Sequence, residues 1–283
     1  MHFTNSPLLK IAMASMVTSL TTIDAVSHEL WIDPERFSIT IDEQVRADLR
    51  VGENYAGGTS PYLPTRTERF EFYFGGTVSN IGGRAGDRPA IQFEAQQEGL
   101  LVIAYESDVS TVRYTEFEKF KAFVDHKNFE GALEAHAARK LSTDDFVETY
   151  SRHAKSLVAV GDGAGSDVAV GMITEIIALD NPYNVDVTQG MRVQVNYLGS
   201  PRANAQVEIY ARPNGEGNAS QNVTVDTVFT DHAGIATIPI QAGYDFMLDA
   251  VVLREPPPER AEIRDAVWDS LWANMSFSVP MGR

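Results

Sequence analysis

Short runs in which apolar and polar residues alternate constrain this chain more than any other feature of its sequence. They include residues 37–41 (Phe-Ser-Ile-Thr-Ile) and 70–74 (Phe-Glu-Phe-Tyr-Phe), and Gly or Pro clusters separate them. Alternation places successive side chains on opposite faces of a β-strand. Together with the apolar runs at 90–93 and 99–105, the pattern predicts a sandwich-like β domain in the first half of the chain.

Alternation returns after Asp180-Asn181-Pro182 and continues toward the C-terminus. It is clearest in residues 191–197 and 205–210, and a tight turn at 231–234 separates two further runs. This spacing is typical of an immunoglobulin-like or transthyretin-like sandwich. We therefore expect a mainly β fold with two sandwich-like domains, residues 28–180 and 181–283.

Residues 115–157 interrupt the alternation. Phe117, Phe120 and Phe123 recur at helical spacing, and we interpret Phe146 to Leu157 in the same way, with the polar residues 142–145 as its N-cap. The first domain is thus expected to contain a helical insertion at about 115–157. The acidic glycine turn that follows, residues 161–167, lacks the residues of a phosphate-binding or calcium-binding loop.

The first 27 residues have the features of a signal peptide. Lys10 precedes an apolar run, residues 11–20, that is too short to cross a bilayer, and Ala25 and Ser27 place small side chains before a cut at His28. We expect an exported, periplasmic protein that begins at His28 and does not insert directly into the membrane after cleavage. An uncleaved amphipathic start is the alternative.

Charge and composition exclude several classes of function. The chain has 23 Lys and Arg against 39 Asp and Glu, for a formal net charge of −16, which argues against nucleic-acid or membrane-surface partners. It has no cysteine, which excludes thiolate zinc sites, iron–sulfur clusters and cysteine nucleophiles. A metal site would therefore use His, carboxylate, Met or backbone ligands.

No motif indicates an enzyme. Ser156 and Ser166 lie in no nucleophile elbow, and the sequence has no His-Glu-x-x-His motif. We expect a protein without catalytic activity. A copper oxygenase acting on polysaccharide stays open as a minor hypothesis, although the three tryptophans are scattered along the chain.

Several segments together resemble an exported bacterial family, the domain of unknown function 4198, which is often labelled NikM-like for nickel or cobalt uptake. The resembling segments are residues 27–34, 148–157, 178–183, 199–210, 230–234 and 267–273. Their order and spacing carry the resemblance, since no single segment is specific. The resemblance implies a two-part periplasmic β protein connected with transition-metal handling, without an established reaction or ligand set.

Cleavage before His28 would create a potential metal chelate. The free amine and the imidazole of an N-terminal histidine can bind one ion, and a second histidine completes a three-nitrogen site of the kind that copper(II) and nickel(II) prefer. We choose His153 as that partner, with Glu29 and Asp33 as further ligands or as groups that orient an imidazole. The alternatives are an exposed or strand-starting His28, a surface-helix His153 and two plain surface acids.

The remaining histidines of the mature chain are weaker candidates. We expect His126 and His136 to face solvent, and His232 occupies a turn in the other domain. The leading hypothesis is a periplasmic accessory protein that captures nickel, cobalt or copper and presents it to a membrane transporter or an envelope partner protein. The alternative is a non-enzymatic ligand-binding or protein-interaction module of the envelope.

Overall fold

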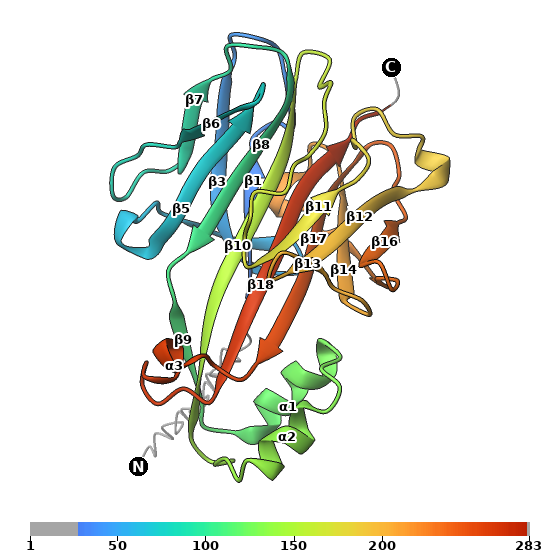
Figure 1. Cartoon of the computed structure of the whole chain (residues 1–283). Coiled ribbons are helices and arrows are strands. Elements are labelled where there is room, and N and C mark those ends of the chain that lie inside the picture. Colours follow the sequence, from blue (N-terminus) through green and yellow to red (C-terminus); the bar gives the residue numbers. More distant parts are fainter. Residues whose placement is uncertain (1–27, 282–283) are drawn as a thin grey trace, which may run out of the picture.

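The computed structural model describes residues 28–281, so the predicted signal peptide, residues 1–27, lies outside the described residues. The fold is mainly β, as the sequence predicts, and its strands form three sheets (Figure 1). Within the described part of the chain, no helix is long and apolar enough to cross a membrane.

The first sheet, sheet A, is antiparallel and has the order β1-β3-β4, with β7 paired to β3. Its strands are β1 (Glu29–Pro34), β3 (Gln44–Glu53), β4 (Ala56–Ser60) and β7 (Ile91–Glu94). In β3 the alternation matches the burial, because Val45, Ala47 and Leu49 are buried while the residues between them are partly exposed.

The second sheet, sheet B, has ten strands and connects both halves of the sequence. Along the sheet the strands are β15 (Thr224–Phe229), β14 (Gln206–Pro213), β17 (Tyr244–Arg254), β18 (Trp268–Val279), β10 (Phe146–Val160), β8 (Gly99–Ser107), β5 (Thr67–Phe74) and β6 (Thr77–Asn80), and β2 (Ser38–Ile39) and β9 (Ser110–Tyr114) also pair with β10. The long strands β10 and β18 lie side by side and parallel, from Glu148 opposite Trp268 to Ser156 opposite Ser276 (Figure 1).

The third sheet, sheet C, covers part of sheet B. Its strands are β11 (Thr174–Ala178), β12 (Met191–Tyr197), β13 (Ser200–Pro201) and β16 (Ile235–Ile238). The helices are α1 (Phe117–His126), α2 (Ala132–Ala138) and α3 (Pro258–Ala261), with short 3-10 turns η1 (Pro64–Arg66), η2 (Val187–Gln189) and η3 (Gly217–Ala219). Helices α1 and α2 lie at the end of the molecule where β10 begins (Figure 1).

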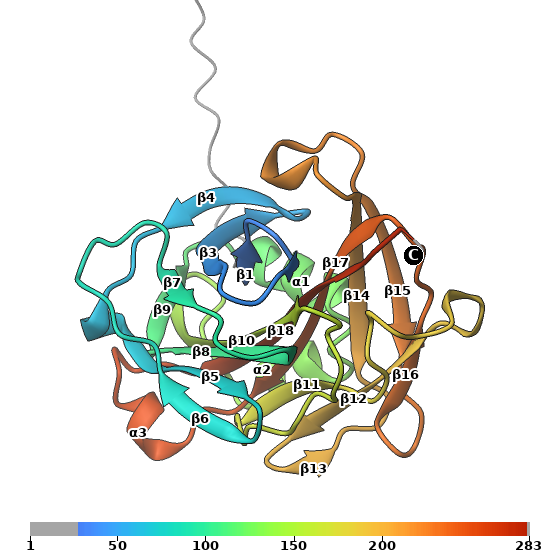
Figure 2. The ribbon, with the colours of Figure 1, turned by 90° about the horizontal axis from the view of Figure 1, so that it is seen from above.

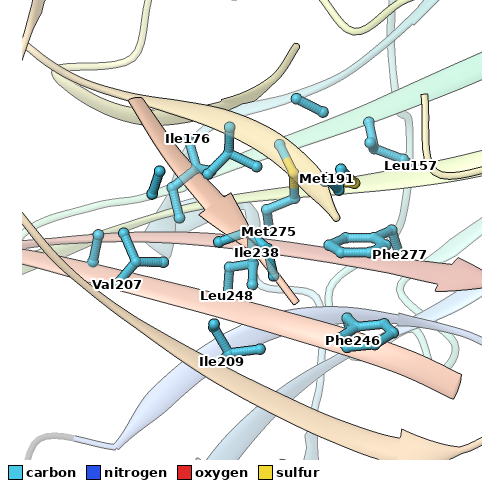
Figure 3. Packing of buried hydrophobic residues seen from close by; sticks show 14 of the residues in the cluster. Leu157, Ile176, Met191, Val207, Ile209, Ile238, Phe246, Leu248, Met275 and Phe277 are labelled. Carbon is cyan, nitrogen blue, oxygen red and sulfur yellow. The ribbon is translucent and has the colours of Figure 1, made fainter. Parts of the chain in front are cut away.

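Two main cores lie on opposite faces of sheet B. One packs sheet C against β14, β17 and β18, with Met191, Leu248 and Phe277 among its members (Figure 3). The other packs sheet A against β5, β8 and β10. Because β10 is covered on both faces, Leu157 belongs to the first core and Val158 to the second. Its last residues are therefore apolar without alternation.

The predicted helical insertion is correct for α1 and α2 but wrong for residues 146–157, which form strand β10. A strand buried on both faces lacks the period-two signal, and its apolar positions resemble those of a buried helix. The expected N-cap is a turn instead, in which Ser142 Oγ accepts hydrogen bonds from the amides of Asp144 and Asp145.

The predicted domain boundary at residue 181 falls within a continuous structure. The core around sheet A is built from residues before it, but sheet B joins β10 from one side to β18 from the other. Seen from above, the strands of both halves surround β10 and β18 (Figure 2). The division into domains 28–180 and 181–283 stays a prediction.

Candidate functional site

Strand β1 lies over a polar face of sheet B. On β14 the odd residues Val207 and Ile209 enter the core with sheet C, so the even residues, among them Glu208 and Arg212, turn toward β1. The same alternation turns polar residues of β17 and β18 to this side, namely Asp245, Asp249, Asn274, Ser276 and Ser278. Because β1 and the end of α1 cover this face, these polar residues are buried.

The side of β1 that meets this face carries Glu29, Trp31 and Asp33. Trp31 packs with Tyr55, Tyr210 and Met247 in a small buried cluster. Gly57 lies against it, since a Cβ there would come within 2.8 Å of the Trp31 ring. This apolar cluster separates a polar group around Glu29 from a second polar group around Asp33.

Three buried acids meet at the Glu29 end: Glu29, Glu208 and Asp249, named here the acidic triad. One carboxylate oxygen from each lies within 4.8 Å of the others. Glu208 and Asp249 are direct cross-strand neighbours on β14 and β17, which explains their proximity. Like charges this close in a buried place raise each other's pKa unless a cation compensates them.

The end of α1 supplies the compensating groups. Lys127 Nζ donates hydrogen bonds to Glu208 at 2.8 Å and to Asp249 at 2.9 Å, and it lies 3.8 Å from Glu29. Its ammonium also makes a cation–π contact with the Trp272 ring, 4.9 Å from the ring centroid. His126 Nε2 lies 2.9 Å from Glu208 Oε1. One lysine therefore faces three carboxylates.

The three acids differ in their affinity for a proton. Burial, reinforced by the charge of Asp249, raises the pKa of Glu29 to about 7. Burial also raises the pKa of Asp249, against the opposing charge of Lys127. For Glu208, burial is outweighed by the hydrogen bond from His126 and the charge of Lys127, and its pKa is lowered. Glu29 therefore takes up a proton more readily than Glu208 does.

Some oxygens at the triad lack a hydrogen-bond partner within residues 28–281. They are Glu29 Oε2, Asp249 Oδ1 and, on the neighbouring strand, Asn274 Oδ1, whose amide nitrogen Nδ2 is also unpartnered. Asn274 lies directly opposite Asp249 and is only 2% exposed. Buried acceptors without a donor cost about 1–3 kcal/mol each. A bound cation would satisfy oxygens of this kind.

Glu29 of the triad lines a cleft of about 500 Å³, while Glu208 and Asp249 are buried behind it. The cleft is lined mainly by acidic and basic side chains, including Glu29, Glu53, Glu116, Glu118, Lys119, His126 and Lys127. Outside it, His28 Nδ1 lies 3.2 Å from Glu53 Oε1, and the His28 side chain is 37% exposed. Carboxylates therefore line the cleft beside the triad, and Lys127 separates Glu208 and Asp249 from it.

The structure does not bring together the predicted pair His28 and His153. The His28 carbonyl accepts hydrogen bonds from Arg152 on one face of β10, while the next residue, His153, points to the other face. There, His153 is buried, with Nδ1 3.3 Å from the Trp272 carbonyl and Nε2 3.6 Å from Glu106. Burial lowers the pKa of His153 to about 4. Its expected position on a helix was wrong.

Glu29 and Asp33 are both buried, in different places. Glu29 belongs to the triad, as a ligand role requires. Asp33 accepts hydrogen bonds from Arg50 and Arg212 beyond the Trp31 cluster, so it does not share a site with His28. Nor are they surface acids, because each is less than a tenth exposed.

The other histidines divide between the cleft and a core. His126 is exposed, as predicted, although it contacts Glu208. The prediction for His136 was wrong: it is buried, accepts a hydrogen bond from Trp268 Nε1 at 3.0 Å and lies 3.0 Å from the Ser142 carbonyl. It is a core histidine of the α1–α2 unit.

Sequence reasoning missed Glu208, Asp249 and Lys127. In β14 the order Val-Glu-Ile-Tyr-Ala-Arg alternates, so Glu208 is expected to face solvent. Asp249 did give a signal, because it stands alone inside the apolar run 246–252, and a charge within such a strand is rare unless it is paired. Nothing in the alternation indicates that β1 and α1 cover this face.

Comparison with known families places the chain. Residues 25–253 match the family described as domain of unknown function (DUF4198), and the chain belongs to this family. This confirms the resemblance noted in the sequence as far as the family; its nickel and cobalt label stays a prediction. No curated protein matches the sequence.

Solved structures give only remote similarity. Salmonella alpha-2-macroglobulin reacted with methylamine is 12% identical over 89% of this chain and 15% of its own, with a TM-score of 0.22. The D0-D1 domain of intimin is 12% identical over 88% and 97%, with a TM-score of 0.20. The Yersinia pseudotuberculosis adhesin InvE is 12% identical over 89% and 58%, with a TM-score of 0.21. Similarities at this level indicate no function.

Proposed function

We propose that this member of the DUF4198 family is a periplasmic accessory protein that binds a divalent transition-metal ion at the acidic triad. The observation that carries the proposal is the convergence of three buried carboxylates, two of whose oxygens are unpartnered, behind a cleft that Glu29 lines. The His126 imidazole, already in contact with Glu208, is a fourth candidate ligand.

The donor set favours certain ions. Carboxylates with one imidazole bind divalent first-row metals, and the affinity of such sites rises from cobalt through nickel to copper. Nickel and cobalt, which the family resemblance implies, both suit this mixture. The protein would then hold the ion for a membrane transporter or another envelope protein. The acidic side chains of the cleft would attract cations from solution.

Lys127 occupies the place that a metal ion would take. Binding therefore requires the ammonium to withdraw into the cleft, which Lys127 also lines. Lys127 follows the last residue of α1, and Asn128 next to it has a left-handed φ of 52°, so the side chain leaves from a turn. The two positive charges of the metal ion would replace the charge of the Lys127 ammonium and the proton on Glu29.

Calorimetric titration with nickel(II) and cobalt(II) tests the proposal on protein that begins at His28. Wild type is expected to bind one ion, and Asp249→Asn, which keeps the shape of the side chain, is expected to lose more than about tenfold in affinity. Asp226→Asn, an exposed acid on β15, serves as the matched control. No saturable binding, or equal affinity in all three proteins, would contradict the proposal.

One further variant separates the triad from the chelate predicted at His28. An extra residue before His28 abolishes a chelate that uses the free amine, but it leaves the triad unchanged. We expect equal nickel affinity with and without the extra residue. A large loss would assign the ion to the N-terminus instead.

A further inference from the structure

The second polar group under β1 surrounds Arg212 at the other end of the Trp31 cluster. Arg212 is 1% exposed, and its guanidinium stacks on Tyr55, 3.9 Å from the ring centroid. Its Nη2 donates to Asp33 at 2.6 Å, and Asp33 in turn accepts from Arg50. A buried guanidinium is thus fixed from two sides.

Within the described part of the chain, the other nitrogens of this guanidinium, Nη1 and Nε, lack hydrogen-bond partners. Arg212 Nη1 has no hydrogen-bond partner within residues 28–281, and Nε lies 3.6 Å from Asp245 Oδ2, too far for a hydrogen bond. Arg212 and Asp245 both line a cavity of about 550 Å³. A rigid, buried donor therefore stands beside a carboxylate at the wall of an open cavity.

The charged side chains that line this cavity indicate which class of ligand it can bind. Three guanidinium groups line it together with four carboxylates: those of Arg36, Arg50 and Arg212, and those of Asp33, Glu35, Asp48 and Asp245. A simple anion would satisfy Arg212 but add to the excess of acid. A simple cation would leave Arg212 Nη1 without an acceptor. A ligand with both charges on neighbouring atoms satisfies both groups.

We infer that this cavity binds a zwitterionic small molecule of the α-amino acid class, with its carboxylate on Arg212 Nη1 and its ammonium on Asp245. Guanidinium groups hold carboxylates through paired N–H donors. Arg212 Nε lies 3.6 Å from Asp245 Oδ2, so the guanidinium and the carboxylate that would hold the ligand are neighbours, as are the two charged groups of an α-amino acid. Phe37 and Pro280, which also line the cavity, offer apolar contacts to a side chain.

This site is independent of the acidic triad, because the buried Trp31 cluster lies between them. It therefore does not rest on the proposed metal function, and either can fail without the other. It also gives a defined binding site to the alternative hypothesis, a ligand-binding module of the envelope.

A thermal-shift screen of the full chain from His28 with each of the twenty L-amino acids tests the inference, since a ligand that binds the folded state raises the unfolding temperature. For each amino acid that stabilises, the amine lacking its carboxylate and the acid lacking its ammonium are run beside it. We expect at least one amino acid to stabilise the protein and neither of its truncated analogues to do so. No stabilising amino acid, or equal stabilisation by an analogue, would overturn the inference.

The variant Asp245→Asn locates the site. It removes the charge expected to hold the ammonium while keeping the side-chain volume, and affinity in calorimetry should fall more than about tenfold. Asp226→Asn is again the control and should bind as wild type does. If Asp245→Asn folds and binds with unchanged affinity, the site is wrong. If it does not fold, Ser278→Ala, at the same cavity wall, must weaken binding for the inference to stand.

Discussion

At the scale of single residues, the buried acid Glu148 makes the stability of the fold depend on pH. Glu148 on β10 is fully buried beside Tyr114, whose hydroxyl donates to it at 3.1 Å, and Ser270. Burial raises the pKa of Glu148 from 4.5 to about 7. The folded state therefore holds a proton on Glu148 at pH values where the unfolded chain has lost it.

This difference makes Glu148 stabilising at low pH. Its contribution is full below pH 4.5 and is lost as pH rises to about 7, which corresponds to about 3 kcal/mol of unfolding free energy. Glu148→Gln, which keeps hydrogen bonds to both neighbours, should lose this part of the pH dependence. Urea denaturation at pH 5 and 7.5 measures it, with the exposed Glu94→Gln as control. Identical pH dependence in Glu148→Gln and wild type would contradict the assignment.

At the triad, the raised pKa of Glu29 couples metal binding to pH. An ion must displace the proton of Glu29, and of His126, whose hydrogen bond to Glu208 raises its pKa. Nickel affinity should therefore increase between pH 6 and pH 8, with protons released on binding. Calorimetry in buffers of different ionisation enthalpy counts these protons. Affinity that is constant with pH would exclude Glu29 and His126 as ligands.

Among the elements, the α1–α2 unit contributes most to the candidate site, since it carries Lys127 and His126 to the triad. Removing one partner of a buried ion pair costs about 3–5 kcal/mol, because it leaves uncompensated charge. Lys127→Met should therefore destabilise the metal-free protein by about this amount. The same variant should gain more stability from nickel than wild type does, because no ammonium competes.

Thermal unfolding with and without nickel measures both effects. Lys121→Met, on the exposed side of α1, is the control and should change neither. If Lys127→Met destabilises the protein but nickel does not restore its stability, Lys127 is a structural counter-ion and the triad is no metal site.

The elements also show where sequence reasoning succeeds and where it fails. Alternation predicts strands such as β5 and β14, because each has one apolar face. It failed at β10, whose two faces are both covered, and it assigned Glu208 to solvent because nothing local reveals what covers a strand. The structure places His28 beside Glu53 at the cleft, but His153, its predicted partner, lies on strand β10 and not on a helix. Packing between segments that are distant in the sequence determines both the burial of β10 and the covering of Glu208.

At the scale of the whole molecule, sheet B links the two predicted domains through β10 and β18. Leu157 and Val158 are neighbours on β10, yet they belong to cores on opposite sides of the sheet. We expect the two halves to unfold together, because opening either core disrupts this strand pair.

Denaturation followed by both tryptophan fluorescence and circular dichroism tests this cooperativity. Leu157→Ala should lower the unfolding free energy by about 2–5 kcal/mol, and Val158→Ala should lower it less, while both probes still report one shared transition. Two separate transitions, each sensitive to only one of the variants, would show instead that the halves are independent domains.

The location of a bound ion tests the central claim most directly. Crystals of the protein grown with nickel(II), and measured at the nickel absorption edge, should show one anomalous peak within bonding distance of Glu208 and Asp249, with the Lys127 ammonium withdrawn. A protein that remains metal-free at the triad, or a peak confined to the His28 amine and imidazole, would contradict it.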